Sequence, residues 1–370
     1  MTAFRRLALL TTGATYFLVF VGGLVRVSGA GLGCPDWPKC FGRWIPPTSL
    51  DQLPPDIDPS TFNITLAWIE YINRLVGVTV GFLILAVAVL AIRHFRKTPR
   101  VLYSSLAAAI LVAIQGWQGS QVVASELEPL IVTIHMVLAL VIVSLLIFAT
   151  LESYTVSAER DKRTAEFPRY IRTLIGVLWP VTIIQIILGS QVRQALETVA
   201  SQYPRMSNAQ WFAHVGAINE LHLIVGILVG LLTVYTGLVV LRSDAGKAAT
   251  VRYVVFGMMA LVVLQAGSGL KLLVSGVPAL TDLFHLWFAS LYIGLLLVLW
   301  SVVRGPVRLA FEWGTGFRKL AATTLVFVIL MGVGAWLVID QAMQSREQTA
   351  LANNTSGTTR TVDVIPSEHP

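Results

Sequence analysis

Three histidines lie inside long apolar stretches of the sequence, His135, His222 and His285. An imidazole within an apolar membrane helix needs a partner, and it is a functional hypothesis by default. Neutral imidazole suits iron, and two opposed histidines in a helix bundle are typical of bis-axial haem ligation. Zinc would need a third or fourth ligand nearby. His222 and His285 therefore predict a haem site, and histidines hydrogen-bonded between helices are the structural alternative.

A carboxylate, an amide and a guanidinium follow one another closely at Glu70, Asn73 and Arg74. Spacings of three and four residues place side chains on one face of a helix. Glu70 lies about two turns into an apolar run, where a carboxylate is costly unless it is paired. One interpretation is a structural Glu70–Arg74 ion pair. The other is a proton-handling carboxylate beside a reacting centre, with Arg74 binding an anionic group.

The composition sets the environment of these residues. The chain has 370 residues, of which 55% are hydrophobic and 13% are charged, and its mean hydropathy is +0.72. Soluble domains carry about 25% charged residues, and disordered chains have low hydrophobicity. Both classes are excluded, and long apolar runs predict membrane-spanning helices. Nine runs are candidates: Leu7–Val27, Leu66–Ile92, Val101–Val123, Leu130–Leu151, Ile171–Val192, Ile218–Leu241, Val251–Val274, Ala279–Val303 and Leu320–Ile339.

Basic residues are distributed unevenly along the chain. Of the 27 lysines and arginines, 18 precede the first run or lie in alternate loops and the adjoining run ends, 7 lie in the other loops with their adjoining run ends and in the tail, and Arg26 and Arg74 are counted separately. The positive-inside rule then predicts a multi-pass plasma-membrane protein with a cytoplasmic N-terminus and an external C-terminus. The net charge of +7 reflects this topology, so we expect no nucleic-acid partner.

The outer side carries the two largest predicted loops, at about residues 28–64 and 193–217, and a polar tail that we expect to be disordered after Gln341. A signal peptide is the competing interpretation of residues 1–33, but the apolar run is too long for one. Cys34 and Cys40 lie in the first loop, where oxidising conditions favour a disulfide. A structural staple is preferred, because the spacing differs from C-x-x-C. A redox dithiol passing electrons inwards is the alternative.

An internal repeat divides the chain. His135 and His285 are 150 residues apart, and so are the stretches 115–119 (QGWQG) and 265–269 (QAGSG). Asn73 corresponds to His222 at an offset of 149, and Gly22 loosely corresponds to Gly189 at 167. The sequence predicts an all-α membrane protein with two pseudo-symmetric four-helix bundles in a parallel repeat, residues 1–152 and 153–304, followed by a ninth helix and tail, 305–370. In the first half, Asn73 replaces one histidine of the pair.

The stretch GLVRVSGAGLGCPDWPKC at residues 23–40, followed by EYINR at 70–74, resembles the haem A synthase family over roughly residues 5–303. The resemblance implies an oxidoreductase that converts the C8 methyl group of haem O into the formyl group of haem A, for cytochrome oxidase assembly. It also implies that haem b binds between His222 and His285, and that Cys34 and Cys40 form the family's external cysteine pair.

The substrate haem O is then expected in the first half. The family motif there is Glu-x-x-His-Arg, whereas this chain has Asn73 in place of the histidine. The resemblance implies that Glu70 is the catalytic carboxylate and that His135 is the only histidine ligand. Arg74 and Arg26 are expected near the propionates. The departure at Asn73 leaves the coordination position opposite His135 open.

The resemblance also implies partners. We expect haem O to be handed over by haem O synthase, contact with membrane lipid, an electron donor or acceptor that the residues do not identify, and a homo-oligomer. Two other functions remain as alternatives. A di-haem electron-transfer cytochrome would have two complete histidine pairs, and a transporter with parallel repeats would bind no haem.

Overall fold

The computed structural model describes residues 2–155, 167–244, 246, 248–275, 277–304 and 330–348. Within these ranges the chain is almost entirely helical and contains no β-strand. Eight of the described helices are long and apolar enough to cross a membrane. The prediction of an all-α integral membrane protein is therefore confirmed.

The first four spanning helices are α1 (Thr2–Ser28), α2 (Ile64–His94), α3 (Pro99–Ala124) and α4 (Pro129–Thr155). The next four are α5 (Arg169–Gln202), α7 (Ala217–Arg242), α8 (Ala249–Ser275) and α9 (Ala279–Arg304). Among the residues that the structure describes, the short helices bounded between them are η1 (Leu50–Gln52), η2 (Pro59–Thr61) and α6 (Asn208–Val215). Each spanning helix contains one of the first eight apolar runs predicted from the sequence.

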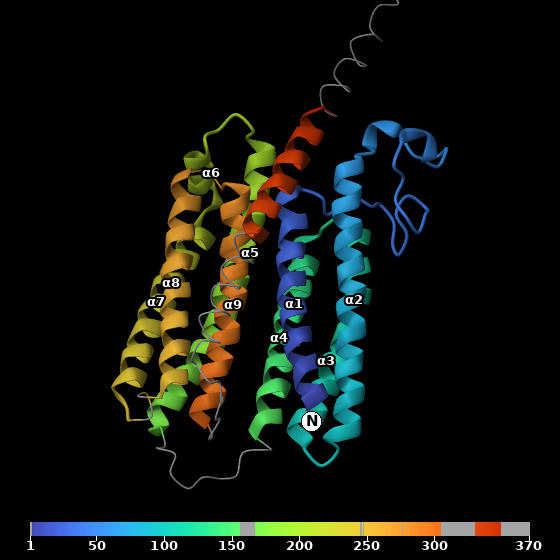
Figure 1. Ribbon diagram of the computed structural model, residues 1–370. Helices are drawn as coiled ribbons and strands as arrows, with labels where there is room; N and C mark the ends of the chain where they lie inside the picture. The colour runs from blue at the N-terminus through green and yellow to red at the C-terminus, as the bar shows by residue number, and fades with distance from the viewer. Residues whose placement is uncertain are drawn as a thin grey trace, which may run out of the picture.

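The two sets of four helices have matching neighbours. In the first set, α1 and α3 each contact α2 and α4, and in the second, α5 and α8 each contact α7 and α9. The sets lie side by side (Figure 1) and meet where α1 and α4 contact α9 and α4 contacts α5. The domain boundaries predicted at 152 and 304 border residues 156–166 and 305–329, which lie outside the described residues. The division into domains stays a prediction.

The helices bury few polar groups and expose many apolar ones. On α7, Ile227 and Leu231 are each 64% exposed, whereas Thr233 is 1% exposed. Lipid tails solvate apolar side chains as well as a protein interior does, so an outward apolar face costs nothing in a bilayer. The hydroxyl group of Thr233 donates a hydrogen bond to the carbonyl oxygen four residues earlier, so this donor has a partner within its own helix.

The second predicted outer loop begins later than expected. The prediction that helix ends at Val192 is wrong, because α5 continues to Gln202. Leu196 and Val199 are buried along this extension, and Arg193 forms an ion pair with Glu197 one turn away at 3.1 Å. The charged residues indicated a loop, but Arg193 and Glu197 are partly buried and pair with each other on a helix that also buries an apolar side.

The ninth helix is described in part. Residues 320–329 of the predicted span lie outside the described residues, and residues 330–348 are helical. The expectation of disorder after Gln341 is therefore wrong for residues 342–348, and residues 349–370 lie outside the described part. Met331 and Ala335 pack against Phe20 of α1 and Trp287 of α9. Figure 1 shows this helix, in red, at the end of the molecule opposite the N-terminus, where α6 and the segment between α1 and α2 also lie.

Candidate functional site

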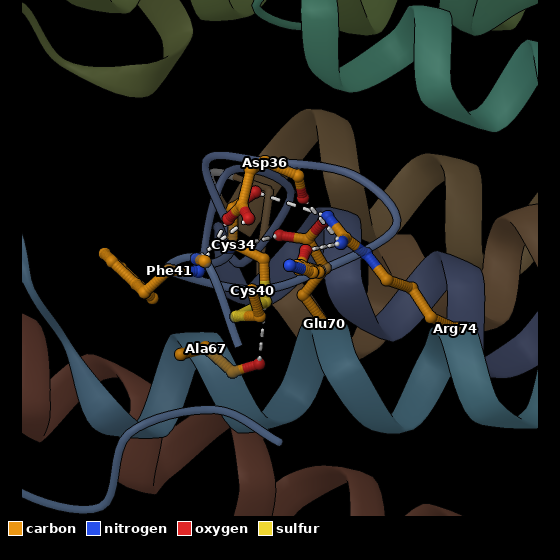
Figure 2. Close-up of a disulfide and its surroundings, with 9 residues drawn as sticks. Cys34, Asp36, Cys40, Phe41, Ala67, Glu70 and Arg74 are labelled. Atoms are coloured by element: carbon orange, nitrogen blue, oxygen red, sulfur yellow. Dashed lines mark hydrogen bonds and ion pairs between the residues drawn. A yellow bond between two sulfur atoms is a disulfide. The ribbon is translucent and has the colours of Figure 1, made fainter. Parts of the chain in front are cut away.

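Glu70 lies on α2 directly beneath the loop that follows α1. Glu70 is buried, with 4% of its surface exposed. One carboxylate oxygen, Oε2, accepts a hydrogen bond from the backbone N–H of Cys34 at 2.8 Å, and the other, Oε1, accepts from Arg74 Nη2 at 2.5 Å. Both oxygens thus have charged or backbone donors (Figure 2), which stabilise the ionised carboxylate in a buried position.

Arg74 binds the loop as well as Glu70. Its Nη1 donates to the carbonyl oxygens of Asp36 at 2.7 Å and Lys39 at 2.8 Å, and Nη2 donates to that of Cys34 at 3.3 Å. The planar guanidinium presents several donors in a fixed fork, so one side chain can hold several carbonyls of a curved segment. The Glu70–Arg74 ion pair therefore exists and also anchors the outer loop over the carboxylate.

The loop is closed by a disulfide between Cys34 and Cys40, as predicted. Both cysteines are fully buried, and Cys34 Sγ lies 3.6 Å from the carbonyl oxygen of Ala67 on α2. Gly33 permits this approach, because a Cβ atom there would lie 2.3 Å from the carbonyl oxygen of Leu66. The disulfide holds the peptide of Cys34 against α2, where its N–H meets Glu70.

His135 on α4 has a defined hydrogen-bonding state. Its Nδ1 lies 2.7 Å from Oε1 of Gln118 on α3. Because an amide oxygen only accepts hydrogen bonds, this contact places the ring hydrogen on Nδ1 and leaves the Nε2 lone pair free. Gln115, one turn earlier, donates to the backbone carbonyl of His135 at 3.0 Å. A metal-ligating histidine usually has its other ring nitrogen held in this way.

The second half holds its two histidines through different contacts. His222 on α7 has Nδ1 3.0 Å from Nε2 of Gln185, and because an amide nitrogen only donates, Nδ1 is the acceptor and the ring hydrogen lies on Nε2. His285 on α9 has Nδ1 2.9 Å from the hydroxyl of Ser268 and Nε2 3.1 Å from Nε2 of Gln265. The two imidazoles are close enough to interact electrostatically.

A glycine faces each of the four repeat-related positions. A Cβ atom added to the glycine would lie 2.9–3.9 Å from the facing side chain. The pairs are Gly22 with Asn73, Gly119 with His135, Gly189 with His222 and Gly269 with His285. Gly22 and Gly189 lie on α1 and α5, and Gly119 and Gly269 lie on α3 and α8, so the spatial contacts follow the repeat found in the sequence.

The residues of the second half fit a haem. Two neutral imidazoles come from α7 and α9, which occupy opposite corners of their four-helix set, and glycines leave room beside each ring. The amide oxygens of Gln185 and Gln265 are buried there without a hydrogen-bond partner among the described residues. Within those residues, no three histidine, cysteine or acidic side chains lie together as metal ligands would, so the pair matches axial haem ligation better than zinc. Ligation through Nε2 of His285 requires Gln265 to move, and ligation through Nε2 of His222 requires the amide of Gln185 to turn its oxygen toward Nδ1.

Arg26 lies at the junction of the two halves. Its charged neighbours are Glu197 and Arg193 of α5 and Asp282 of α9. Arg193 Nε is 2.9 Å from Asp282 Oδ2, and Asp282 is only 5% exposed. The structure thus brings Glu70, Arg74 and the disulfide together, and it places Arg26 in a separate charged cluster.

The polar partners of the histidines were not assigned from the sequence. Gln118 and Ser268 are 150 residues apart and contact Nδ1 of His135 and His285. The signal was present, because both residues belong to the repeated stretches QGWQG and QAGSG. Gln185 has no polar counterpart at position 18, which is leucine, so the repeat could not reveal it.

A sequence family described as cytochrome oxidase assembly protein (COX15-CtaA) matches residues 5–298 of the chain. The chain belongs to that family. The match covers the eight spanning helices except the first three residues of α1 and the end of α9, and residues 330–348 lie beyond it. The COX15-CtaA match therefore includes Glu70, Arg74, both cysteines and all three membrane histidines.

Three similar proteins are haem A synthases, of which two align over most of the same length and one over part of it. The haem A synthase of Shouchella clausii is 24% identical over 298 residues, which are 79% of this chain and 94% of the relative. That of Exiguobacterium sibiricum is 25% identical over 302 residues, 79% of this chain and 93% of the relative. The haem A synthase of Shewanella oneidensis is 31% identical over 147 residues, 38% of this chain and 42% of the relative.

Proposed function

We propose that the protein is a haem A synthase, a membrane oxidoreductase that converts the C8 methyl group of haem O into the formyl group of haem A for cytochrome oxidase. The observation that carries the proposal is the COX15-CtaA match over residues 5–298. It is supported by relatives named haem A synthase that align over more than nine-tenths of their length. An electron carrier or a transporter would not require the buried Glu70–Arg74 pair.

The first half is the proposed substrate site. His135 offers a free Nε2 lone pair and supplies the histidine ligand of haem O. Arg74 already gives its hydrogens to Glu70 and to three loop carbonyls. Among the described residues, no carboxylate pairs directly with Arg26 in the way that Asp282 pairs with Arg193. We therefore propose that Arg26 binds a propionate group of haem O. We propose that Arg74 instead positions the carboxylate of Glu70.

Two successive hydroxylations of the methyl group, followed by loss of one water, leave the formyl group. Over the two hydroxylations the carbon takes its oxygen from water and gives up four protons and four electrons. An electron acceptor takes the electrons, and Glu70 is the proposed group that accepts the protons and passes them on at its carboxylate oxygens. The Cys34 N–H and Arg74 hold this carboxylate in one orientation. The disulfide loop covers it and restricts the access of outer water.

The second half is the proposed cofactor site. Haem b, bound by His222 and His285, supplies one-electron transfer. Gln185 fixes the imidazole of His222 through Nδ1 and the backbone carbonyl, and Ser268 fixes that of His285. These contacts hold both rings in place before a haem binds.

The remaining proposals concern the surroundings. We place the protein in the plasma membrane with its N-terminus in the cytoplasm, so that the disulfide loop faces the oxidising outer side. Haem O synthase is the proposed source of the substrate, an electron donor or acceptor completes the reaction, and a homo-oligomer is the proposed assembly. The apolar outer faces of the helices contact lipid.

Co-expression tests the function directly. The full chain is produced together with a haem O synthase in a host that makes no haem A, and the haems are extracted and separated by chromatography. We expect haem A only when both proteins are present. Haem O alone, with normal amounts of the chain in the membrane, would contradict the proposal and favour an electron-transfer cytochrome.

A further inference from the structure

The two halves differ at one of their four repeat-related positions. α7 and α9 carry His222 and His285, whereas α2 and α4 carry Asn73 and His135. α2 and α4 each neighbour α1 and α3, so they occupy opposite corners of the first half, as α7 and α9 do in the second. Asn73 and His135 therefore occupy the two opposed positions in the first half that His222 and His285 occupy in the second.

The surroundings of Asn73 resemble those of His222, the histidine at the corresponding position of the second half. Gly22 faces it from α1, as Gly189 faces His222 from α5. A Cβ on Gly189 would lie 2.9 Å from the imidazole of His222, whereas one on Gly22 would lie 3.9 Å from Asn73 Oδ1. The shorter side chain leaves more room on the first-half side, and the glycine that accommodates an imidazole is still present.

The amide itself is buried and incompletely bonded. Asn73 Oδ1 is inaccessible to solvent and has no hydrogen-bond partner among the described residues. A buried polar atom without a partner costs free energy, so its presence points to a group that binds beside it. The oxygen can only accept a hydrogen bond, so the amide must turn by half a rotation to present its NH2 group at this position. An asparagine amide is a poor iron ligand, but in that orientation it is a good hydrogen-bond donor, and donors in the distal pocket of a haem govern the binding of small ligands.

We propose that the first-half haem has His135 as its only protein ligand, and that the opposite coordination position takes a small diatomic ligand hydrogen-bonded by the Asn73 amide. This inference rests on the proposed function for the identity of the substrate. To the proposed function it adds the coordination state of the first-half haem and the class of ligand that this haem binds. It also assigns a ligand-binding role to Asn73, the residue at which this chain departs from the family motif.

Carbon monoxide is the probe. The purified full chain is loaded in both halves with protohaem IX, reduced, and titrated with carbon monoxide. We expect one of the two haems to bind it, and we expect the oxidised protein to show one high-spin and one low-spin haem. Two low-spin haems that bind no carbon monoxide would overturn the inference, and so would a first half that takes up no protohaem.

Three variants separate the contributions. Asn73→His should abolish carbon monoxide binding and convert the high-spin haem to low-spin. The matched variant His222→Asn should create a second binding haem in the other half. Asn73→Leu should keep binding but raise the C–O stretching frequency, because the hydrogen bond is lost. An unchanged frequency in Asn73→Leu, or carbon monoxide binding that persists in Asn73→His, would contradict the inference.

The outcomes also distinguish this inference from the proposed function. Haem A formation by a chain whose haems are all six-coordinate would leave the function intact and refute the role of Asn73. Carbon monoxide binding by a chain that never forms haem A would do the opposite.

Discussion

Replacing Arg74 by leucine should destabilise the protein by leaving Glu70 buried without its cation. Arg74 makes an ion pair at 2.5 Å and donates to three loop carbonyls. Removing one partner of a buried ion pair costs about 3–5 kcal/mol, because the other charge remains desolvated. We expect Arg74→Leu to fall in that range.

Glu70→Gln should cost less. The neutral amide oxygen can still accept from Cys34 or Arg74, but hydrogen bonds to a charged group are worth about 1 kcal/mol more than neutral ones. The double variant should therefore be more stable than Arg74→Leu alone, which requires a coupling energy larger than the cost of Glu70→Gln, about 1–3 kcal/mol.

Chemical unfolding in mixed detergent micelles, followed by tryptophan fluorescence, measures these free energies. Arg100→Leu is the matched control, because Arg100 pairs with Glu152 at 3.6 Å with its side chain 71% exposed, and such pairs contribute at most about 1 kcal/mol. Additive effects of the two substitutions at residues 70 and 74 would refute the coupling of carboxylate and guanidinium.

Three further predictions concern the loop and the junction of the halves. Gly33→Ala should cost about 1–3 kcal/mol and speed reduction of the disulfide by an added thiol, since the new Cβ would clash with the backbone of α2; an unchanged reduction rate would argue against close loop packing. Ser345→Ala removes a 2.9 Å hydrogen bond to Asn63 and should increase amide hydrogen exchange at the start of α2, with a stability cost of about 1 kcal/mol. Arg193→Leu should cost about 3 kcal/mol by removing the nearest cation from buried Asp282, and Asp282→Asn should recover part of that loss in the same unfolding assay.

The spanning helices could be predicted because a bilayer requires long apolar segments. The extension of α5 could not, since Leu196 and Val199 become apolar contacts only when another helix lies beside them. The helix at 341–348 was missed for a related reason. Its sequence is polar, but Ala342 is fully buried and Ser345 bonds to Asn63 at the start of α2.

The sequence predicted the residues of the site that lie in the membrane helices better than it predicted the contacts made by the loop. Glu70 and Arg74 were paired from their spacing, and the repeat related Asn73 to His222. The three loop carbonyls that bind Arg74 could not be predicted, because main-chain oxygens carry no sequence signal. The contact between the Cys34 N–H and Glu70 also depends on how the loop folds back over α2.

The most direct test of the account compares extracted haems from cells that co-express haem O synthase with either of two variants. Glu70→Gln removes the proposed proton-handling carboxylate, and Glu220→Gln changes an exposed glutamate in the first turn of α7. We predict that Glu220→Gln forms haem A like the unaltered chain, whereas Glu70→Gln retains haem O while still binding haem b. Haem A formation by Glu70→Gln at the unaltered rate would contradict the central role of this carboxylate.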